Sequence, residues 1–191
     1  MAAVAGPKMR TPRMWAMWAM VVMLHSTLHG CDNAAPPAVN GTVANAVIHG
    51  KAFKLEIAAD ATKRNRGMGG RTEAMIPDDG GMIFTFPRSQ WGPMSFVMRD
   101  CPSDLDILYL DGGGRVLTTY TMKALPPRGP DEGEDDTYNE AYERRITATA
   151  YPSRYSTSFV IELKPGTIQK LGIQEGEKVE FDVDALKRMA R

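Results

Sequence analysis

Histidine and cysteine are scarce in this chain of 191 residues, which holds three histidines and two cysteines. His25 and His29 stand within the first 30 residues, so His49 is the only histidine in the rest of the chain. A site built from several imidazoles, as in many zinc centres, is therefore excluded. Two cysteines are also too few for the disulfide framework of a small secreted scaffold, so the fold must depend on its apolar core.

Motifs that define common enzyme and nucleic-acid-binding classes are absent as well. No glycine-rich loop joins a strand to a helix, and the glycines at residues 112–114 predict a hairpin turn instead. A Ser-His-Asp hydrolase is disfavoured because no nucleophile elbow is present. Residues 31–191 carry 20 basic and 23 acidic side chains, a net charge of −3. We therefore expect neither a nucleic-acid partner nor a bound cofactor.

The apolar run at residues 14–24 (MWAMWAMVVML) is only 11 residues long. A membrane-spanning helix needs roughly 20, so a permanent transmembrane helix is the weaker alternative. Lys8, Arg10 and Arg13 precede the run, and a more polar segment follows it. This order is typical of a bacterial export signal. We expect residues 1–30 to be a signal peptide that is removed.

Residues 28–31 (Leu-His-Gly-Cys) resemble the lipobox of bacterial lipoproteins, although a small residue is usual where this chain has His29. The resemblance implies a lipid on Cys31 and an exported, membrane-anchored protein at the periplasmic or cell surface. Cleavage without lipidation and a disulfide between Cys31 and Cys101 remain the alternatives. Residues 31–42 are polar and contain two adjacent prolines, which predicts a flexible tether.

From residue 43 onward the pattern is one of short apolar runs divided by glycines. Residues 53–57 alternate apolar and charged side chains, as in a strand with one buried face. The same reasoning predicts strands at residues 43–49, 52–58, 82–86, 94–99, 105–110, 115–122, 159–163 and 178–183. Capping residues predict short helices at residues 61–66, 167–171 and 184–191. Residues 123–150 are interpreted as a long loop with a strand at 146–150.

About eight short strands with brief helices predict a β-rich α+β fold, in which a small antiparallel or mixed sheet curls into a barrel or sandwich. A parallel doubly wound fold is disfavoured because it needs long helices between strands. We expect residues 43–191 to form this single domain. The acidic run at residues 131–136 lacks the ligand spacing of a calcium loop and predicts a solvated loop.

Four sequence blocks occur together in the second two-thirds of the chain. They are RGMGGR at residues 66–71, GMIFTF at 81–86, FVMRDCPSDLD at 96–106, and FVIELKPG at 159–166 with LGI at 171–173 and a glycine at 176. In order and spacing these blocks resemble the bacterial and archaeal family called domain of unknown function 192. The resemblance covers about 130 residues, from 53 to 183, and implies a small β-rich fold, frequent export and no assigned biochemistry.

The departures from the family pattern fall mainly in the third block. Val97 stands where the family has tryptophan, Asp100 and Cys101 replace asparagine and threonine, and Asp104 replaces proline. The acidic loop near Asp131 is also longer than is usual for the family. If the third block forms a binding surface, this chain has altered its chemistry.

The candidate binding site combines Arg66, Arg71, Arg99, Asp106 and Glu162, drawn from these blocks. If they converge on one concavity, they form a polar clamp for an unidentified envelope ligand or protein. The alternative is a set of structural ion pairs. With no recognisable catalytic motif, the preferred hypothesis is a non-catalytic binding or accessory domain outside the cytoplasm, anchored by Cys31.

Two further hypotheses stay open. An envelope-polymer hydrolase would use Asp106 and Glu162 as an acid and base pair. A Cu(I) site would use the soft sulfur ligands of Met94, Met98 and Cys101. Most methionines in strands fill the core, however, and these three match no coordination motif, so no metal is expected.

Overall fold

The computed structural model describes residues 38–135 and 137–191, all of which belong to one compact unit. The expected signal peptide, the lipidation of Cys31 and most of the tether lie outside the described residues. Within them, no helix has both the length and the apolar character needed to cross a membrane.

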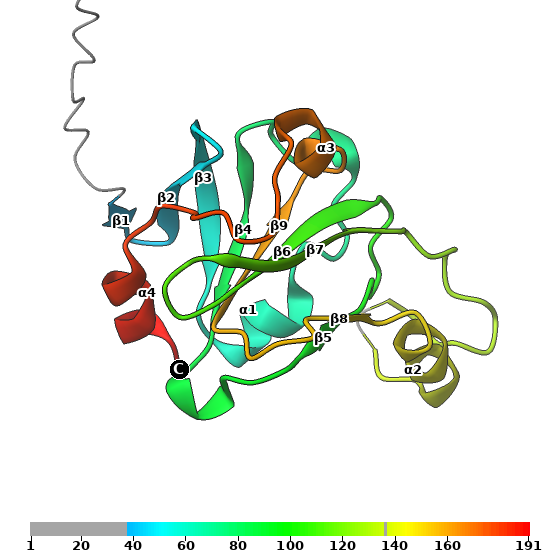
Figure 1. Ribbon diagram of the computed structural model, residues 1–191. Helices are drawn as coiled ribbons and strands as arrows, with labels where there is room; N and C mark the ends of the chain where they lie inside the picture. The colour runs from blue at the N-terminus through cyan, green and yellow to red at the C-terminus, as the bar shows by residue number, and fades with distance from the viewer. Residues whose placement is uncertain (1–37, 136) are drawn as a thin grey trace, which may run out of the picture. The chain divides into compact units, whose positions relative to one another are not determined.

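A seven-stranded mixed sheet dominates the domain (Figure 1). Its strands, in spatial order, are β1 (Val39–Asn40), β2 (Val43–Ile48), β3 (Lys51–Ala58), β4 (Gly80–Thr85), β9 (Phe159–Leu163), β6 (Leu105–Leu110) and β7 (Val116–Met122). Only β3 and β4 pair in parallel, and the other neighbours are antiparallel. β1 and β7 are the two edges, so the sheet is open. The predicted β-rich fold with a mixed sheet is confirmed, and its sandwich-like form fits better than a barrel.

Apolar side chains pack on both faces of this sheet. On one face, Ile161 and Leu108 meet Leu186 of α4 (Val183–Met189) and Ile168 of α3 (Thr167–Leu171). On the other, Val160 lies in a second core cluster. Every residue of β4, β6 and β9 is buried, as expected for central strands covered on both sides.

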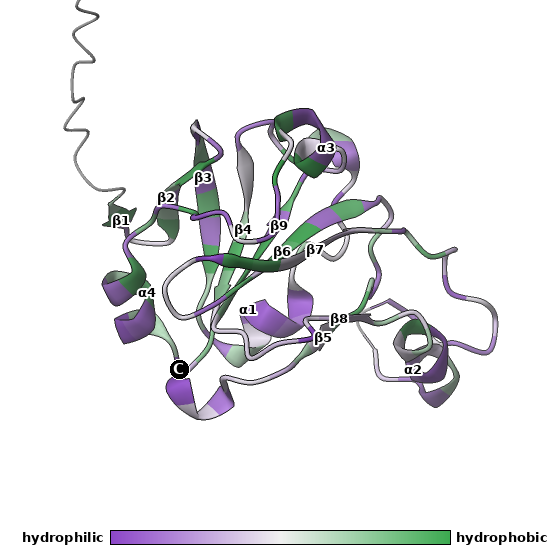
Figure 2. Ribbon diagram, in the orientation of Figure 1, coloured by the Kyte–Doolittle hydropathy of each residue, from purple (hydrophilic) through white to green (hydrophobic). Residues whose placement is uncertain are grey.

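The second face is covered by loops and by a two-stranded sheet. This small sheet pairs β5 (Ser95–Phe96) with β8 (Tyr151–Pro152). Met68, just after α1 (Ala61–Arg66), is buried in the same cluster. Two single 3-10 turns, Glu73–Met75 and Arg88–Gln90, complete the connections. In Figure 2 α1 is drawn mainly in hydrophilic colours, consistent with the absence of buried residues along it.

Local sequence signals set the bounds of the short helices. The Asp60 side chain accepts a 2.9 Å hydrogen bond from the Lys63 amide at the start of α1. Gly67 ends the helix at φ 52°, in the left-handed region that glycine adopts without steric cost. The predicted helices at residues 61–66 and 167–171 are confirmed, because capping and glycine termination are local effects.

The interpretation of residues 123–150 as a loop with a strand at 146–150 is wrong. This segment contains α2 (Glu140–Thr147), where the Asn139 side chain accepts hydrogen bonds from two backbone amides. Tyr142 and Ile146, one helical turn apart, are its buried residues. The β-branched residues after Ile146 suggested a strand, whereas the Asn139 cap and this spacing determine the helix.

Two other predicted strands are reduced in the structure. Residues 94–99 form only the two-residue strand β5. Residues 178–183 make isolated bridges, Val47 with Glu180 and Arg115 with Lys178, before α4 begins. Both segments were predicted as strands from their sequence pattern. In the structure, however, residues 94–99 pair only with the two residues of β8, and residues 178–183 form only isolated bridges, so neither forms a longer strand.

Candidate functional site

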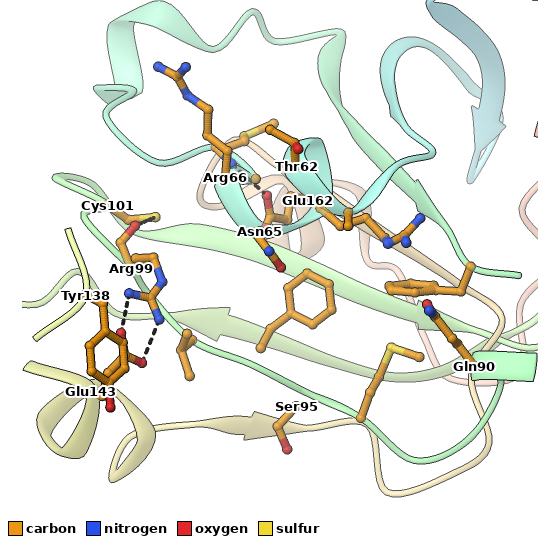
Figure 3. A pocket seen from close by; sticks show the side chains of 18 of the residues that line it. Thr62, Asn65, Arg66, Gln90, Ser95, Arg99, Cys101, Tyr138, Glu143 and Glu162 are labelled. Atoms are coloured by element: carbon orange, nitrogen blue, oxygen red, sulfur yellow. Dashed lines mark hydrogen bonds and ion pairs between the residues drawn. The ribbon is translucent and has the colours of Figure 1, made fainter. Parts of the chain in front are cut away.

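A cleft of about 1030 Å³ opens on the second face of the sheet. It is bordered by α1, by the chain around β5, and by the segment that includes Tyr138 and α2 (Figure 3). Ligand pockets commonly measure about 300–1000 Å³, so this cleft is large for a domain of this size. Within its lining, Glu162 of β9 comes from the seven-stranded sheet, and Ser95 and Phe96 come from β5.

Glu162 lies on a strand that is covered on both faces. It stands opposite Met82 of β4 and Ile107 of β6, and only 4% of its surface is exposed. Its Oε2 atom accepts a 3.2 Å hydrogen bond from the Met68 amide. Within residues 38–135 and 137–191, Oε1 of Glu162 has no hydrogen-bond partner. In the same residues, every fully buried side-chain oxygen has such a partner, so Oε1 is not fully buried. Oε1 is therefore the atom that reaches the cleft.

Gly67 lets the chain after α1 pass directly over this carboxyl group. A Cβ atom on Gly67 would lie 3.3 Å from Oε2 of Glu162 and 3.4 Å from the Phe84 ring. The residue also has a positive φ, which side chains rarely adopt. Both the backbone conformation and the limited space favour glycine at position 67, in the first of the four sequence blocks.

The protonation of Glu162 follows from its surroundings. Burial raises the pKa of Glu162 to about 7, against the opposing effects of the Met68 amide and the positive charge of Arg71. Near neutral pH the group is thus divided between the acid, which donates a hydrogen bond, and the carboxylate, which only accepts. A titratable group of this kind facing a cleft is a strong candidate for a functional residue.

Asp106 does not share the cleft with Glu162. It pairs in register with Leu163, whereas its neighbour Ile107 pairs with Glu162, so the two carboxyl groups point to opposite faces of the sheet. Asp106 is fully buried and accepts 2.7 Å hydrogen bonds from the Thr121 hydroxyl and the Ile168 amide. These contacts join β6 to β7 and α3, which is a structural role.

The three predicted arginines are divided between two hollows. Arg99 lines the cleft and makes a double hydrogen bond of 2.5 and 2.7 Å to Glu143 of α2. Arg71 lies in a smaller hollow of about 360 Å³, where it binds Glu56 of β3 at 2.6 and 2.8 Å. Arg66 borders both hollows and points away from Glu162 (Figure 3). Of the five predicted site residues, Arg66, Arg99 and Glu162 thus line the cleft, whereas Arg71 and Asp106 do not.

One wall of the cleft was not foreseen from the sequence. Arg128 stacks 3.7 Å from the centroid of the Tyr142 ring and binds both carboxylate oxygens of Asp100 at 2.8 Å. Arg145 binds both oxygens of Glu132, a residue of the acidic run expected to be solvated. One signal of this interaction is present in the sequence. Asp100 and the long acidic loop that contains Glu132 both depart from the pattern expected for the resembled family, and the structure brings these two segments together.

The sulfur ligands proposed for Cu(I) are mostly part of the apolar core. Met98 is 1% exposed, and Met94 packs against the same cluster. Cys101 is a free thiol that donates a hydrogen bond to the Arg99 carbonyl, and burial raises its pKa to about 12. Soft-metal binding needs the thiolate, so this environment disfavours it. In the described residues, no group of three or more His, Cys, Asp or Glu side chains is placed to hold a metal ion.

Comparisons with known proteins agree with the fold. The sequence model of a family described as "DUF192: Uncharacterized ACR" matches residues 44–181. No curated protein matches the chain. A solved structure of a Novosphingobium aromaticivorans protein of unknown function is similar, with 28% identity, a TM-score of 0.54, and coverage of 77% of this chain and 94% of that one.

A second similar structure comes from Sinorhizobium meliloti 1021 and is described as a proposed transcription regulator. It has 22% identity and a TM-score of 0.54, and the match covers 72% of this chain and 90% of that chain. At this identity the likeness concerns the fold alone.

Replacing Asp106 by alanine should lower the free energy of unfolding by about 3 kcal/mol, because the Ile168 amide and the Thr121 hydroxyl lose their buried acceptor. Asp106→Asn should cost only about 1 kcal/mol, since its oxygen can accept from Ile168 while its NH2 group donates to Thr121. Urea denaturation measures both values. The exposed Asp184 offers a control, and D184A should stay within about 0.5 kcal/mol of wild type. A fully stable D106A variant would contradict the structural role.

The stability of the domain should fall with rising pH because of Glu162. Its native pKa of about 7 exceeds the ordinary value of 4.5, so the folded protein holds a proton that the unfolded chain releases. The contribution is fully present below about pH 4.5 and is lost as the pH rises through about 7. At about 1.4 kcal/mol per pKa unit, the penalty reaches about 3 kcal/mol above pH 7.

The side-chain amide of Glu162→Gln carries no charge at any pH. This variant therefore avoids the loss of stability that ionisation of Glu162 causes in the wild type. Urea denaturation should therefore show equal stability of E162Q and wild type at about pH 4, and a more stable E162Q at about pH 8. Glu143→Gln is the matched control with the opposite sign, because the hydrogen bonds from Arg99 lower the pKa of Glu143. A difference between E162Q and wild type that does not change with pH would refute the raised pKa.

Proposed function

The chain belongs to the DUF192 family, and we propose that its domain is an exported binding or accessory module whose ligand occupies the Glu162 cleft. The observation that carries the proposal is a carboxyl group on a central strand, 4% exposed, with one oxygen open to a large cleft. Burying an acid without a charged partner is costly, so its retention favours a role in recognition.

A binding role is favoured over hydrolysis by the surroundings of Glu162. Glycoside hydrolysis needs a second free carboxyl group beside the acid. Asp106 lies on the opposite face of the sheet, and Glu143, the other carboxylate in the cleft lining, is held by Arg99. The hydrolase hypothesis based on Asp106 and Glu162 therefore lacks its second group.

Blocking the cleft should abolish ligand binding without unfolding the domain. We expect at least one class in an envelope-solute library of sugars, peptides and lipids to raise the Tm of the purified chain by about 5 °C or more near saturation. Asn65→Trp fills the cleft from an exposed position whose side chain makes no hydrogen bond in the described residues. This variant should keep its own Tm and lose the shift.

Gln174→Trp provides the control, because Gln174 is exposed and outside the cleft lining. Its response to the library should equal that of wild type. Equal shifts in wild type and N65W would place the ligand elsewhere, and a library without any effect would count against a binding function.

Presentation from a membrane is the second part of the proposal. It is supported by the basic residues, the short apolar run and the lipobox-like segment that ends at Cys31. Mass spectrometry of the membrane fraction should find a mature N-terminus at Cys31 with a diacylglycerol adduct, and Cys31→Ser should prevent both. His29→Ala restores a small residue and should be processed at least as completely. An unmodified Cys31 or another N-terminus would mean a freely exported domain.

A further inference from the structure

The side chains around the cleft leave a particular set of polar groups free. The neutral groups without hydrogen-bond partners among the described residues are hydroxyls and amides, on Thr62, Ser95, Tyr138, Asn65 and Gln90. The open carboxyl oxygen of Glu162 and the outward-pointing Arg66 guanidinium also have none. Hydroxyls, amides and a protonated carboxyl group all donate and accept hydrogen bonds. Figure 3 shows Asn65 pointing from α1 toward the chain around β5, and Glu162 beside α1.

Aromatic rings supply the apolar part of the same cleft. Phe86, Phe96 and Tyr138 line it, and Tyr138 is 80% exposed. Phe96 is fixed by edge-to-face contacts with Phe84 and Tyr109, with centroid distances of 5.0 and 5.8 Å. Aromatic faces carry partial negative charge and attract weakly positive C–H groups, such as those on the face of a sugar ring.

Little uncompensated charge faces the ligand space. Glu143 binds Arg99 through both oxygens, the Arg64 guanidinium donates to three backbone carbonyls, and Arg66 points outward. Arg66 is thus the cation of the cleft lining that has no hydrogen-bond or ion-pair partner within the described residues, and it points away from Glu162. An anionic ligand beside Glu162 would meet no such cation there, and a deprotonated Glu162 would repel it.

We infer that the cleft binds an uncharged oligosaccharide, with Glu162 donating a hydrogen bond to a ligand oxygen and the aromatic rings packing against sugar C–H faces. This inference rests on the proposed binding function and names its ligand class. A volume of about 1030 Å³ exceeds the needs of one sugar ring and suits a short oligomer. Binding then requires the protonated carboxyl group and weakens as the pH rises.

The other titratable groups around Glu162 do not change protonation between about pH 6 and about pH 8, the range in which Glu162 does. Arg71, from the loop after α1, stays charged and is bound to Glu56 of β3. Cys101, before β6, and Tyr109, on β6, both have pKa values raised by burial and remain protonated. A change in affinity around neutral pH therefore reports on Glu162.

Isothermal titration of the purified chain with maltotriose, cellotriose and tri-N-acetylchitotriose tests the inference, with triglutamate, trilysine and n-hexanol as charged and apolar comparators. At least one neutral trisaccharide should bind, and about tenfold more weakly at about pH 8 than at about pH 6, because only the protonated fraction is competent. Glu162→Gln should bind at both pH values with equal affinity, since the amide also donates. Glu162→Ala should lose binding.

Asn65→Ala and Gln90→Ala should each weaken trisaccharide binding several-fold with unchanged Tm, whereas Gln174→Ala, outside the cleft, should have no effect. Glu162-dependent binding of a charged or apolar comparator in place of every trisaccharide would overturn the saccharide assignment and leave the binding function intact. Trisaccharide binding that is independent of pH and of Glu162 would also overturn it. Absence of binding by all six probes would overturn the saccharide assignment, and the response of the Tm to the envelope-solute library then decides whether the binding function stands.

Discussion

The burial of β9 on both faces is the constraint on which the rest of the structure depends. This strand lies between β4 and β6, and each of its five residues is buried. Any polar group on it must be neutral or hydrogen-bonded, because water does not surround it. Glu162 meets this requirement through the Met68 amide, through a raised pKa and through one oxygen at the cleft. Gly67 is needed so that the chain can pass close enough to make the contact.

The same sheet assigns different roles to its two buried acids. Glu162 and Asp106 are close in the fold, since β9 and β6 are neighbours, yet the pleat directs them to opposite faces. Asp106 is saturated by a hydroxyl and a backbone amide and joins three elements, so it serves the fold. Glu162 has one hydrogen bond and an open side, so it is the candidate ligand-binding acid of the cleft. The number of hydrogen bonds that each carboxyl group accepts, more than the residue type, distinguishes the structural Asp106 from this candidate.

The segment around α2 forms one wall of the cleft. Its attachment uses charged pairs around one ring: Arg128 with Asp100, Arg99 with Glu143, and Tyr142 beneath them. Asp100, a departure from the family pattern in the third sequence block, therefore belongs to the same cluster of charged pairs as the long acidic loop.

The sequence by itself determined the elements that depend on local chemistry. Alternation predicted β3 and β6, Asp60 and Gly67 bounded α1, and the four blocks identified the family. It also selected Glu162 and Arg99, since charged residues within apolar strands or motifs stand out. Only the tertiary structure decided which charges meet. Arg71 binds Glu56, Arg66 points outward and Asp106 faces the other side, because strand register and long-range packing set these distances. For the same reason, local sequence patterns did not predict α2 or the free amide side chains of the cleft. Their roles depend on contacts between segments that are far apart in the chain.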